Sequence, residues 1–218
     1  MNNAQKYSFT KILSYLNQNL LHKICNKELS IHKPKLLITG ASGFLGYHLL
    51  RVAEERFEVY GIGYKNGFDF RNAISIKCDI TNYIELGNYF EDIGPDVVIH
   101  TAAIADANFC ERNKELSYAT NVETTKNFAG LCSDYNIPFV FTSTDLVFDG
   151  TKSMYREEDE KNPLSTYALH KSIAEDNVLR IYPSALVFRL PVMFGSPLAS
   201  PSNYLQNFIA QIKSGNTV

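Results

Sequence analysis

Beyond Pro34, the chain alternates between short apolar runs and longer segments whose apolar residues stand three or four apart. The short runs predict strands and the longer segments predict helices. This alternation is typical of βαβ units, in which helices cover both faces of a parallel sheet. It predicts an α/β fold with a doubly wound parallel sheet. The expected strands are 35–39, 57–63, 74–78, 96–101, 138–143 and 185–190, and the expected helices are 44–55, 82–92, 112–135, 165–181 and 202–213.

Two of the apolar runs, PDVVIH and PFVFTS, show no alternation of polar and apolar residues. A strand that is covered on both faces has no solvent-facing side and therefore needs no polar positions. These two runs are expected to form central strands of the sheet.

The first 33 residues form a separate region in this pattern. Their apolar residues recur at three- and four-residue steps, as in an amphipathic helix, at Phe9, Ile12, Leu13, Leu16, Leu20 and Ile24. The region holds five lysines and one glutamate, a net charge of +4 in a chain whose net charge is −2. Such a helix could lie on an anionic membrane surface, direct targeting, pack on its own domain or on a partner subunit, or result from an upstream start codon. We divide the chain into a helical extension, residues 1–33, and an α/β domain, residues 34–218.

A glycine-rich turn, TGASGFLG, follows the first predicted strand and opens the next helix. In a doubly wound sheet this turn faces the ligand crevice, where backbone N–H groups and a helix N-terminus can bind an anion. Of Gly40, Gly43 and Gly46, one would allow the tight turn, one the approach of a pyrophosphate and one close helix packing. The motif indicates a dinucleotide site, and the alternative is a turn that serves packing alone.

The end of the second strand should select the dinucleotide. A carboxylate there would bind the ribose of NAD, whereas a cation suits the 2′-phosphate of NADP. The segment VYGIGYK has no carboxylate before Asp69, and it ends in Lys65, with Arg71 nearby. We therefore expect NADP, with NAD as the alternative. A solvated loop lysine would explain Lys65 equally simply.

The third and fourth strands end in residues that could also contact the cofactor. Asp79 could bind the adenine by a hydrogen bond, and Ile80 could pack against it. Asp79 could equally cap the following helix. The stretch HTAA ends the fourth strand with the small side chains of Ala102 and Ala103, which leave room for a cofactor.

The sequence YALHK places Tyr167 and Lys171 one helical turn apart, on the same face of a helix that Pro163 and Ser165 would open. A free tyrosine has a pKa of about 10, and a neighbouring ammonium stabilises the phenolate and lowers that pKa. Tyr167 would then serve as a general acid or base. The alternative is a pair of surface residues.

The strand before this helix, within PFVFTSTDLVFDG, ends in Ser143 and Thr144. A hydroxyl at that edge of the sheet could hold the oxygen of a carbonyl substrate. Thr144, Tyr167 and Lys171, downstream of a dinucleotide turn, describe a hydride-transfer site in which Tyr167 supplies the proton and Thr144 orients the oxygen.

Composition excludes several other classes of protein. A pI near 6.2 and the absence of a basic run interleaved with aromatics argue against nucleic-acid binding. No apolar run is long enough for a membrane span, and no signal peptide opens the chain. The four cysteines are scattered, with no metal-ligand or disulfide spacing, so we expect no metal and a reducing, cytoplasmic setting.

Several motifs together resemble a known family. In their order and spacing they are similar to those of the extended short-chain dehydrogenase/reductases, most closely the dTDP-4-dehydrorhamnose reductase branch; they are TGASGFLG, HTAA, Asn121, STDLVFDG, YREED, YALHK and FRLPVMFG. The chain is also similar to the regulatory beta subunit of methionine adenosyltransferase, a non-catalytic relative in that branch. The resemblance covers residues 35 to 195 and implies a Rossmann-type domain.

The resemblance assigns roles to individual residues. It implies a catalytic triad of Thr144, Tyr167 and Lys171, with Asn121 as a structural or proton-relay residue. It implies cofactor contacts from Gly40, Ser42, Gly43, Phe44, Leu45, Gly46, Lys65, Asp79, Ile80, Ala102, Ala103, Tyr167, Lys171 and Leu190. It also suggests that helices 112–135 and 165–181 form a four-helix interface in a homodimer.

The sequence departs from the family pattern at several points. Leu146 replaces a common aromatic residue and Ala168 a common glycine, but neither change removes a reacting group. The substrate-binding subdomain that the family carries after the sixth strand is expected to be largely absent from these 218 residues.

The sequence favours an NADP-dependent reductase of a nucleotide-activated keto sugar in deoxysugar, dTDP-rhamnose or polysaccharide synthesis. The 4-keto group of dTDP-4-dehydrorhamnose is the first expected target. The alternatives are a non-catalytic, NADP-binding regulatory or interaction subunit, and a truncated, inactive remnant.

Overall fold

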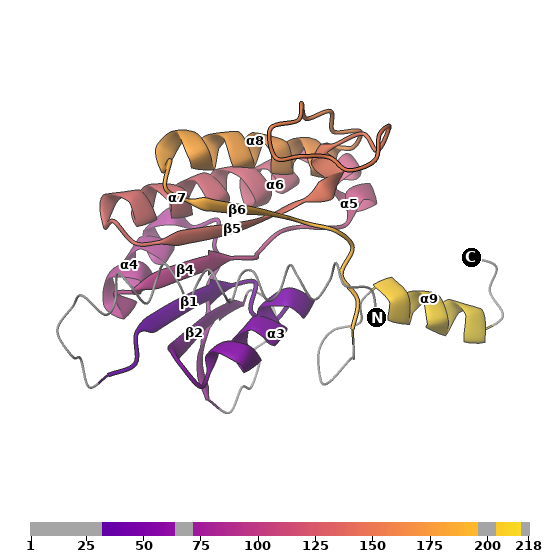
Figure 1. Ribbon diagram of the computed structural model, residues 1–218. Coiled ribbons are helices and arrows are strands. Elements are labelled where there is room, and N and C mark those ends of the chain that lie inside the picture. The colour runs from indigo at the N-terminus through magenta and orange to yellow at the C-terminus, as the bar shows by residue number, and fades with distance from the viewer. Residues whose placement is uncertain (1–31, 64–71, 196–203, 215–218) are drawn as a thin grey trace. The chain divides into compact units, whose positions relative to one another are not determined.

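Within the residues that the structure describes, six parallel strands form one sheet (Figure 1). The computed structural model describes residues 32–63, 72–195 and 204–214. The strands run in the order β3-β2-β1-β4-β5-β6, which confirms the doubly wound prediction. They are β1 (Lys35–Thr39), β2 (Glu58–Gly63), β3 (Ala73–Lys77), β4 (Val97–His100), β5 (Phe139–Thr144) and β6 (Leu186–Leu190).

The chain reverses its direction of travel across the sheet between β1 and β4, which are direct neighbours. Every residue of β4 and β5 is buried, as their continuous apolar runs predict. In sheets of this kind ligands bind beyond the carboxyl ends of the strands at such a reversal. The topology therefore directs attention to the turns after β1 and β4.

Helices cover both faces of the sheet (Figure 1). On one face lies α3 (Phe44–Ala53), and on the other lie α4 (Tyr83–Ile93), α7 (Thr124–Asp134) and α8 (Thr166–Ile181). The core between the sheet and this second group of helices is built on large buried side chains, among them Leu86, Phe90, Phe128, Phe139, Phe141 and Val178. This packing fixes α8 against β5, the two elements that carry the predicted catalytic residues.

The single helix predicted over 112–135 is wrong in detail. The structure has α5 (Ala107–Arg112), α6 (Lys114–Tyr118), a π-helical segment η2 (Ala119–Glu123) and α7. Asn113 interrupts the helix because its backbone is not helical (φ −132°, ψ 58°). In η2 the helical turn holds an extra residue, an arrangement that is frequent at functional sites.

The helix starts follow local capping chemistry. Ser165 caps α8 by accepting a hydrogen bond from the Ala168 N–H (3.2 Å), as predicted. Asn82 caps α4 and Asp106 caps α5 in the same way. Each cap satisfies a backbone N–H that has no partner within its helix. Asp79 does not cap α4, so that alternative is wrong.

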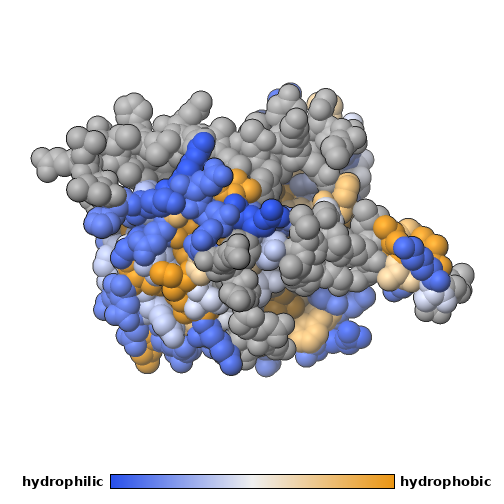
Figure 2. All heavy atoms as spheres, turned by 90° about the horizontal axis from the view of Figure 1, so that it is seen from below, coloured by the Kyte–Doolittle hydropathy of each residue, from blue (hydrophilic) through white to orange (hydrophobic). Residues whose placement is uncertain are grey.

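The two ends of the chain differ in how much of them the structure describes. The chain divides into two units, Met1–Pro34 and Lys35–Val218. The helix predicted over residues 1–33 lies outside the described residues except for positions 32 and 33. The predicted last helix is present as α9 (Tyr204–Lys213), and Figure 2 shows hydrophobic beside hydrophilic residues on its surface. Ile209 and Ile212 of α9 are both exposed.

Some site types are absent from the described part of the chain. None of its helices is long and apolar enough to cross a membrane. Its His, Cys, Asp and Glu residues form no cluster of three that could hold a metal ion. Cys78, Cys110 and Cys132 are buried and not in disulfide bonds.

Candidate dinucleotide and catalytic site

The glycine turn after β1 is shaped by two close backbone approaches. Gly40 has a φ of +66°, and a Cβ there would lie 2.8 Å from the backbone of Ala102, beyond β4. A Cβ on Gly46 would lie 2.2 Å from the carbonyl oxygen of Gly40. Only glycine fits either position without displacing backbone. The motif therefore brings α3 and the turn after β4 tightly against the end of β1.

The N-terminus of α3 offers backbone N–H groups to a ligand. Gly43 is the N-cap of this helix and has no side chain with which to cap it. The first N–H groups of a helix have no carbonyl partner within it, and the helix dipole adds partial positive charge there. This is the physical requirement for binding a pyrophosphate, and the glycine turn meets it.

A cavity of about 600 Å³, here called the glycine cavity, opens over this turn. Seven residues predicted to contact a cofactor line it: Gly40, Ser42, Gly43, Asp79, Ile80, Ala102 and Ala103. The Asp79 carboxylate accepts hydrogen bonds from the Thr81 N–H (3.0 Å) and hydroxyl (2.6 Å). The cavity thus combines an anion-binding turn with a small-residue, largely apolar wall, which fits a dinucleotide.

Other predicted cofactor contacts do not line the glycine cavity. Phe44, Leu45, Gly46 and Leu190 are not among its lining residues, and Leu190 lies opposite Thr144 in the β5–β6 pair. Lys65, on which the choice of NADP rests, lies outside the described residues. The roles of these residues stay predictions.

The structure adds lining residues that were not among the predicted cofactor contacts. They come from the ends of β2 and β3, the turn after β4, α5, α6 and η2: Ile62, Gly63, Cys78, Thr81, Thr101, Ile104, Phe109, Leu116 and Thr120. The ends of β2 and β3 could have been included from the predicted doubly wound sheet, because ligands bind beyond the carboxyl ends of its strands. Residues on α5, α6 and η2 could not, because their place depends on the broken helix.

Thr144 and Tyr167 come together at the carboxyl end of β5. The Thr144 hydroxyl accepts a hydrogen bond from the Leu146 N–H (3.2 Å) and lies beside the Tyr167 phenol, where it acts to lower the pKa of the phenol. Burial and the nearby Cys110 and Asp145 have the opposite and larger effect, so the pKa of Tyr167 rises to about 12. The expected lowering of this pKa is therefore wrong. At neutral pH Tyr167 carries its proton, the form that a proton donor needs.

Lys171 is buried, and its ammonium contacts residues of β5. Its ammonium donates a hydrogen bond to the Thr142 carbonyl (2.7 Å) and lies 4.1 Å from the centre of the Phe141 ring. Burial lowers its pKa to about 7, although the Glu175 carboxylate acts in the opposite direction. Lys171 is thus already neutral at the high pH at which Tyr167 loses its proton, so it does not lower the Tyr167 pKa.

Asn121 lies in the π-helical segment and holds the loop after β4. Its side-chain oxygen accepts a hydrogen bond from the Ile104 N–H (2.8 Å), and its amide donates to the Ile104 carbonyl (3.0 Å) and the Ser117 hydroxyl (3.3 Å). Of the two roles implied for Asn121, these contacts favour the structural one, because both ends of the amide are occupied.

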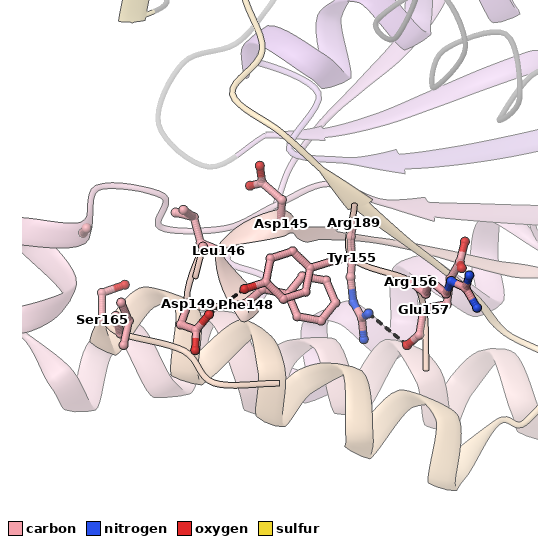
Figure 3. A pocket seen from close by; sticks show the side chains of 12 residues that line it. Asp145, Leu146, Phe148, Asp149, Tyr155, Arg156, Glu157, Ser165 and Arg189 are labelled. Atoms are coloured by element: carbon pink, nitrogen blue, oxygen red, sulfur yellow. Dashed lines mark hydrogen bonds between the residues drawn. The ribbon is translucent and has the colours of Figure 1, made fainter. Parts of the chain in front are cut away.

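A second cavity, here called the charged cavity, has a volume of about 800 Å³ and lies beside the end of β5 (Figure 3). The stacked rings of Phe148 and Tyr155 (centroids 4.2 Å apart) lie between Asp149 and Arg189. Arg189 reaches the buried Glu175 by two hydrogen bonds (2.8 and 3.0 Å) and donates to the Glu157 carbonyl. Arg189 in this wall is therefore held by a buried carboxylate behind the cavity and by a backbone carbonyl beside it.

Comparison with known proteins places this geometry in a family. The family model described as RmlD substrate binding domain matches residues 34–218. The chain is 33% identical over 160 residues to a probable low-salt glycan biosynthesis reductase, Agl14, of Haloferax volcanii, covering 73% of this chain and 53% of that protein. It is 30% identical over 175 residues to methionine adenosyltransferase 2 subunit beta of Xenopus laevis, covering 79% and 51%. The chain thus spans about half the length of these relatives.

Solved structures agree with the fold. A hypothetical dTDP-4-dehydrorhamnose reductase from Sulfolobus tokodaii is 33% identical with a TM-score of 0.73, covering 84% of this chain and 63% of that one. The dTDP-4-dehydrorhamnose reductase from Bacillus anthracis, in complex with NADP, is 26% identical with a TM-score of 0.71, covering 84% and 60%. The Bordetella bronchiseptica enzyme WbmH, in complex with NAD+, is 25% identical with a TM-score of 0.75, covering 85% and 64%.

Proposed function

Because the chain belongs to the RmlD substrate binding domain family, we propose that it is the cofactor-binding and catalytic part of an NADP-dependent reductase of a nucleotide-activated keto sugar. The 4-keto group of dTDP-4-dehydrorhamnose is the first candidate substrate, in keeping with the reductases that it resembles. The observation that carries the proposal is that the Thr144 hydroxyl and the Tyr167 phenol meet at the carboxyl end of β5, downstream of the glycine turn. We place the reaction in the cytoplasm.

The glycine cavity supports the cofactor part of this proposal. Its glycine turn and the open N-terminus of α3 suit the pyrophosphate, and Asp79 and Ile80 suit the adenine. Two relatives of known structure hold NADP or NAD+. NADP is preferred because of Lys65, and NAD is the alternative.

The residues of the chain would handle the carbonyl oxygen and its proton. A bound nicotinamide supplies hydride to the carbonyl carbon. The Thr144 hydroxyl orients the carbonyl oxygen, and the Tyr167 O–H transfers its proton to that oxygen as the C–H bond forms. Lys171, one helical turn away, would stabilise the remaining phenolate while its own amine is protonated, until solvent returns the proton.

The decisive experiment compares Tyr167→Phe with Tyr135→Phe. Tyr135 is an exposed tyrosine whose hydroxyl donates to Glu91, so it is a control for the loss of a phenol. Tyr167→Phe should lower kcat by about 100- to 10,000-fold, the usual contribution of a general acid. NADPH fluorescence titrations should show that cofactor binding persists in both variants. Full turnover by Tyr167→Phe would refute the proposal.

A second candidate function is supported by the likeness to methionine adenosyltransferase 2 subunit beta. On this view the chain binds NADP without turning over a sugar and serves as a subunit of another enzyme. Native mass measurement after pull-down from the source cells would show a stable hetero-complex. Turnover of a keto sugar nucleotide by the isolated chain would exclude it. Absence of cooperative unfolding would instead indicate an inactive remnant.

The homodimer prediction remains part of the proposal. Leu169 and Leu179 of α8 are exposed, as an interface helix requires. Sedimentation of the purified chain would test it, and replacement of both leucines by glutamate should yield a monomer.

A further inference from the structure

His100, the last residue of β4, is fully buried and belongs to none of the roles assigned above. Its ring lies among Phe128, Phe139 and Phe141, with centroid distances of 4.7, 6.2 and 5.9 Å. A polar ring in such surroundings must have partners for both nitrogens, because an unpaired buried polar atom is costly. Both partners are threonine hydroxyls. The other hydrogen bonds that each hydroxyl makes determine which ring nitrogen carries the proton.

The Nδ1 side of the ring meets Thr39 at the end of β1. The Thr39 hydroxyl oxygen accepts hydrogen bonds from the N–H groups of Thr101 and Ala102, both at 3.2 Å. It lies 2.7 Å from His100 Nδ1. With both lone pairs used, the hydroxyl can only donate to the ring. His100 Nδ1 therefore carries no proton.

The Nε2 side of the ring meets Thr125 on α7. The Thr125 hydroxyl donates to the Asn121 carbonyl (2.8 Å) and lies 3.1 Å from His100 Nε2. Its single proton is used in that bond, so its oxygen must accept one from the ring. Both ends of the network thus require the same neutral Nε2–H tautomer. Burial, and next the charge of Lys171 on α8, lower the pKa of His100 to about 3, so the ring stays neutral at physiological pH.

Both ends of this hydrogen-bond network lie on one loop, residues 101–104. At one end the N–H groups of Thr101 and Ala102 donate to Thr39, which donates to the His100 ring. At the other end the ring is linked through Thr125 to the Asn121 carbonyl, and the Asn121 side chain bonds the N–H and the carbonyl of Ile104. Residues 101–104 all line the glycine cavity. The loop has no regular secondary structure of its own.

We propose that His100, as the neutral Nε2–H tautomer, is a positioning residue that holds the loop of residues 101–104 in the shape required for dinucleotide binding. It acts through Thr39 at one end of the loop and through Thr125 and Asn121 at the other. The cofactor part of this inference rests on the proposed function, whereas the clamping of the loop does not.

The first test measures the tautomer of the His100 ring. The nitrogen NMR signals of His100 in the full chain should show the Nε2–H tautomer, unchanged from about pH 5 to about pH 8. An Nδ1–H tautomer, or titration of the ring within that range, would overturn the proposal.

The second test compares Thr125→Val with Thr142→Val. Each removes one buried hydroxyl, but that of Thr142 bonds the His100 backbone carbonyl (3.1 Å) and not its ring. Thr125→Val should speed amide hydrogen exchange at residues 101, 102 and 104 by at least about tenfold. Thr142→Val should change it by less than about twofold. Thr125→Ser, which keeps the hydroxyl, should restore protection from exchange. Equal exchange in all three variants would refute the proposal that His100 holds this loop.

The third test measures NADPH affinity in the same variants. Thr125→Val should weaken binding by about tenfold and Thr125→Ser should restore it. If the unchanged chain bound no NADPH, the proposed function would fail. The hydrogen-exchange and tautomer measurements would still test whether His100 holds the loop of residues 101–104. If NADPH bound equally to all variants, His100 would not position the cofactor site.

Discussion

The glycine cavity and the charged cavity lie beyond the carboxyl ends of the same sheet but are built differently. The first is lined by backbone and small or apolar side chains, with Asp79 as its one acidic residue, and its shape depends on positions where no Cβ fits. The second is lined by aromatic, aliphatic and charged side chains, among them Arg189, which is held by the buried Glu175 behind the wall. Thr144 and Tyr167 lie where β5 ends and α8 begins. The comparison suggests that the first surface is rigid and specific, whereas the second can adapt to its ligand.

The largest predicted effect tests the rigidity of the glycine cavity. Gly46→Ala would place a Cβ 2.2 Å from the Gly40 oxygen and 2.7 Å from Ala41 Cα, both backbone atoms. We expect it to lower the free energy of unfolding by about 3 kcal/mol and to abolish NADPH binding. Gly87→Ala in α4, where a Cβ meets nothing within 4 Å, should instead raise stability by up to about 1 kcal/mol. Equal results in urea denaturation would contradict this account.

The next effect concerns the charged cavity. Glu175 is buried and accepts two hydrogen bonds from Arg189, so Glu175→Gln should lower the free energy of unfolding by about 2 kcal/mol. Asp176 also pairs with a lysine, Lys161, but its side chain is 70% exposed. Asp176→Asn should therefore cost less than about 0.5 kcal/mol. A larger loss in Asp176→Asn than in Glu175→Gln would reverse the expected order.

Stability should depend on pH through Lys171, which lies one helical turn from Tyr167. Its pKa is about 7 in the folded chain and has its ordinary higher value in the unfolded chain, so above pH 7 the unfolded state binds more protons. Stability should therefore rise from about pH 7 to about pH 8, by up to about 1.4 kcal/mol per pH unit. The rise should be absent in Lys171→Met, measured by denaturation at each pH. A slope that persists in this variant would have another source.

The smallest effect is expected after the end of β3, where two substitutions distinguish a helix cap from a cofactor contact. Asn82→Ala should lower the free energy of unfolding by about 1 kcal/mol, because Asn82 caps α4, and should leave NADPH affinity almost unchanged. Asp79→Asn should show the opposite pattern, with weaker NADPH binding and a smaller loss of stability. Matching changes in both variants would show that residues 79–82 act as one unit.

The sequence predicted the parts of this molecule that depend on local chemistry. The doubly wound parallel sheet follows from alternating periods, and the lining of the glycine cavity follows from turns at successive strand ends, as with Gly40 and Ala102. The break near Asn113 and the π-helical segment were not predictable, since the bonds of Asn121 to Ile104 span 17 residues. The Tyr167 and Lys171 pKa values were also out of reach, because burial decides them and depends on the assembled core. His100 was missed because its partners Thr39 and Thr125 lie 61 and 25 residues away.

The π-helical segment Ala119–Glu123 also limits which changes of length the chain can tolerate. Deleting one residue there would allow an ordinary α-helix, which is locally favourable. It would also rotate everything on the N-terminal side by about 100° relative to α7. Ser117, which bonds His170 on α8 at 2.9 Å, would then turn away from its partner. In related chains, gaps should therefore avoid this stretch even where its residue types vary.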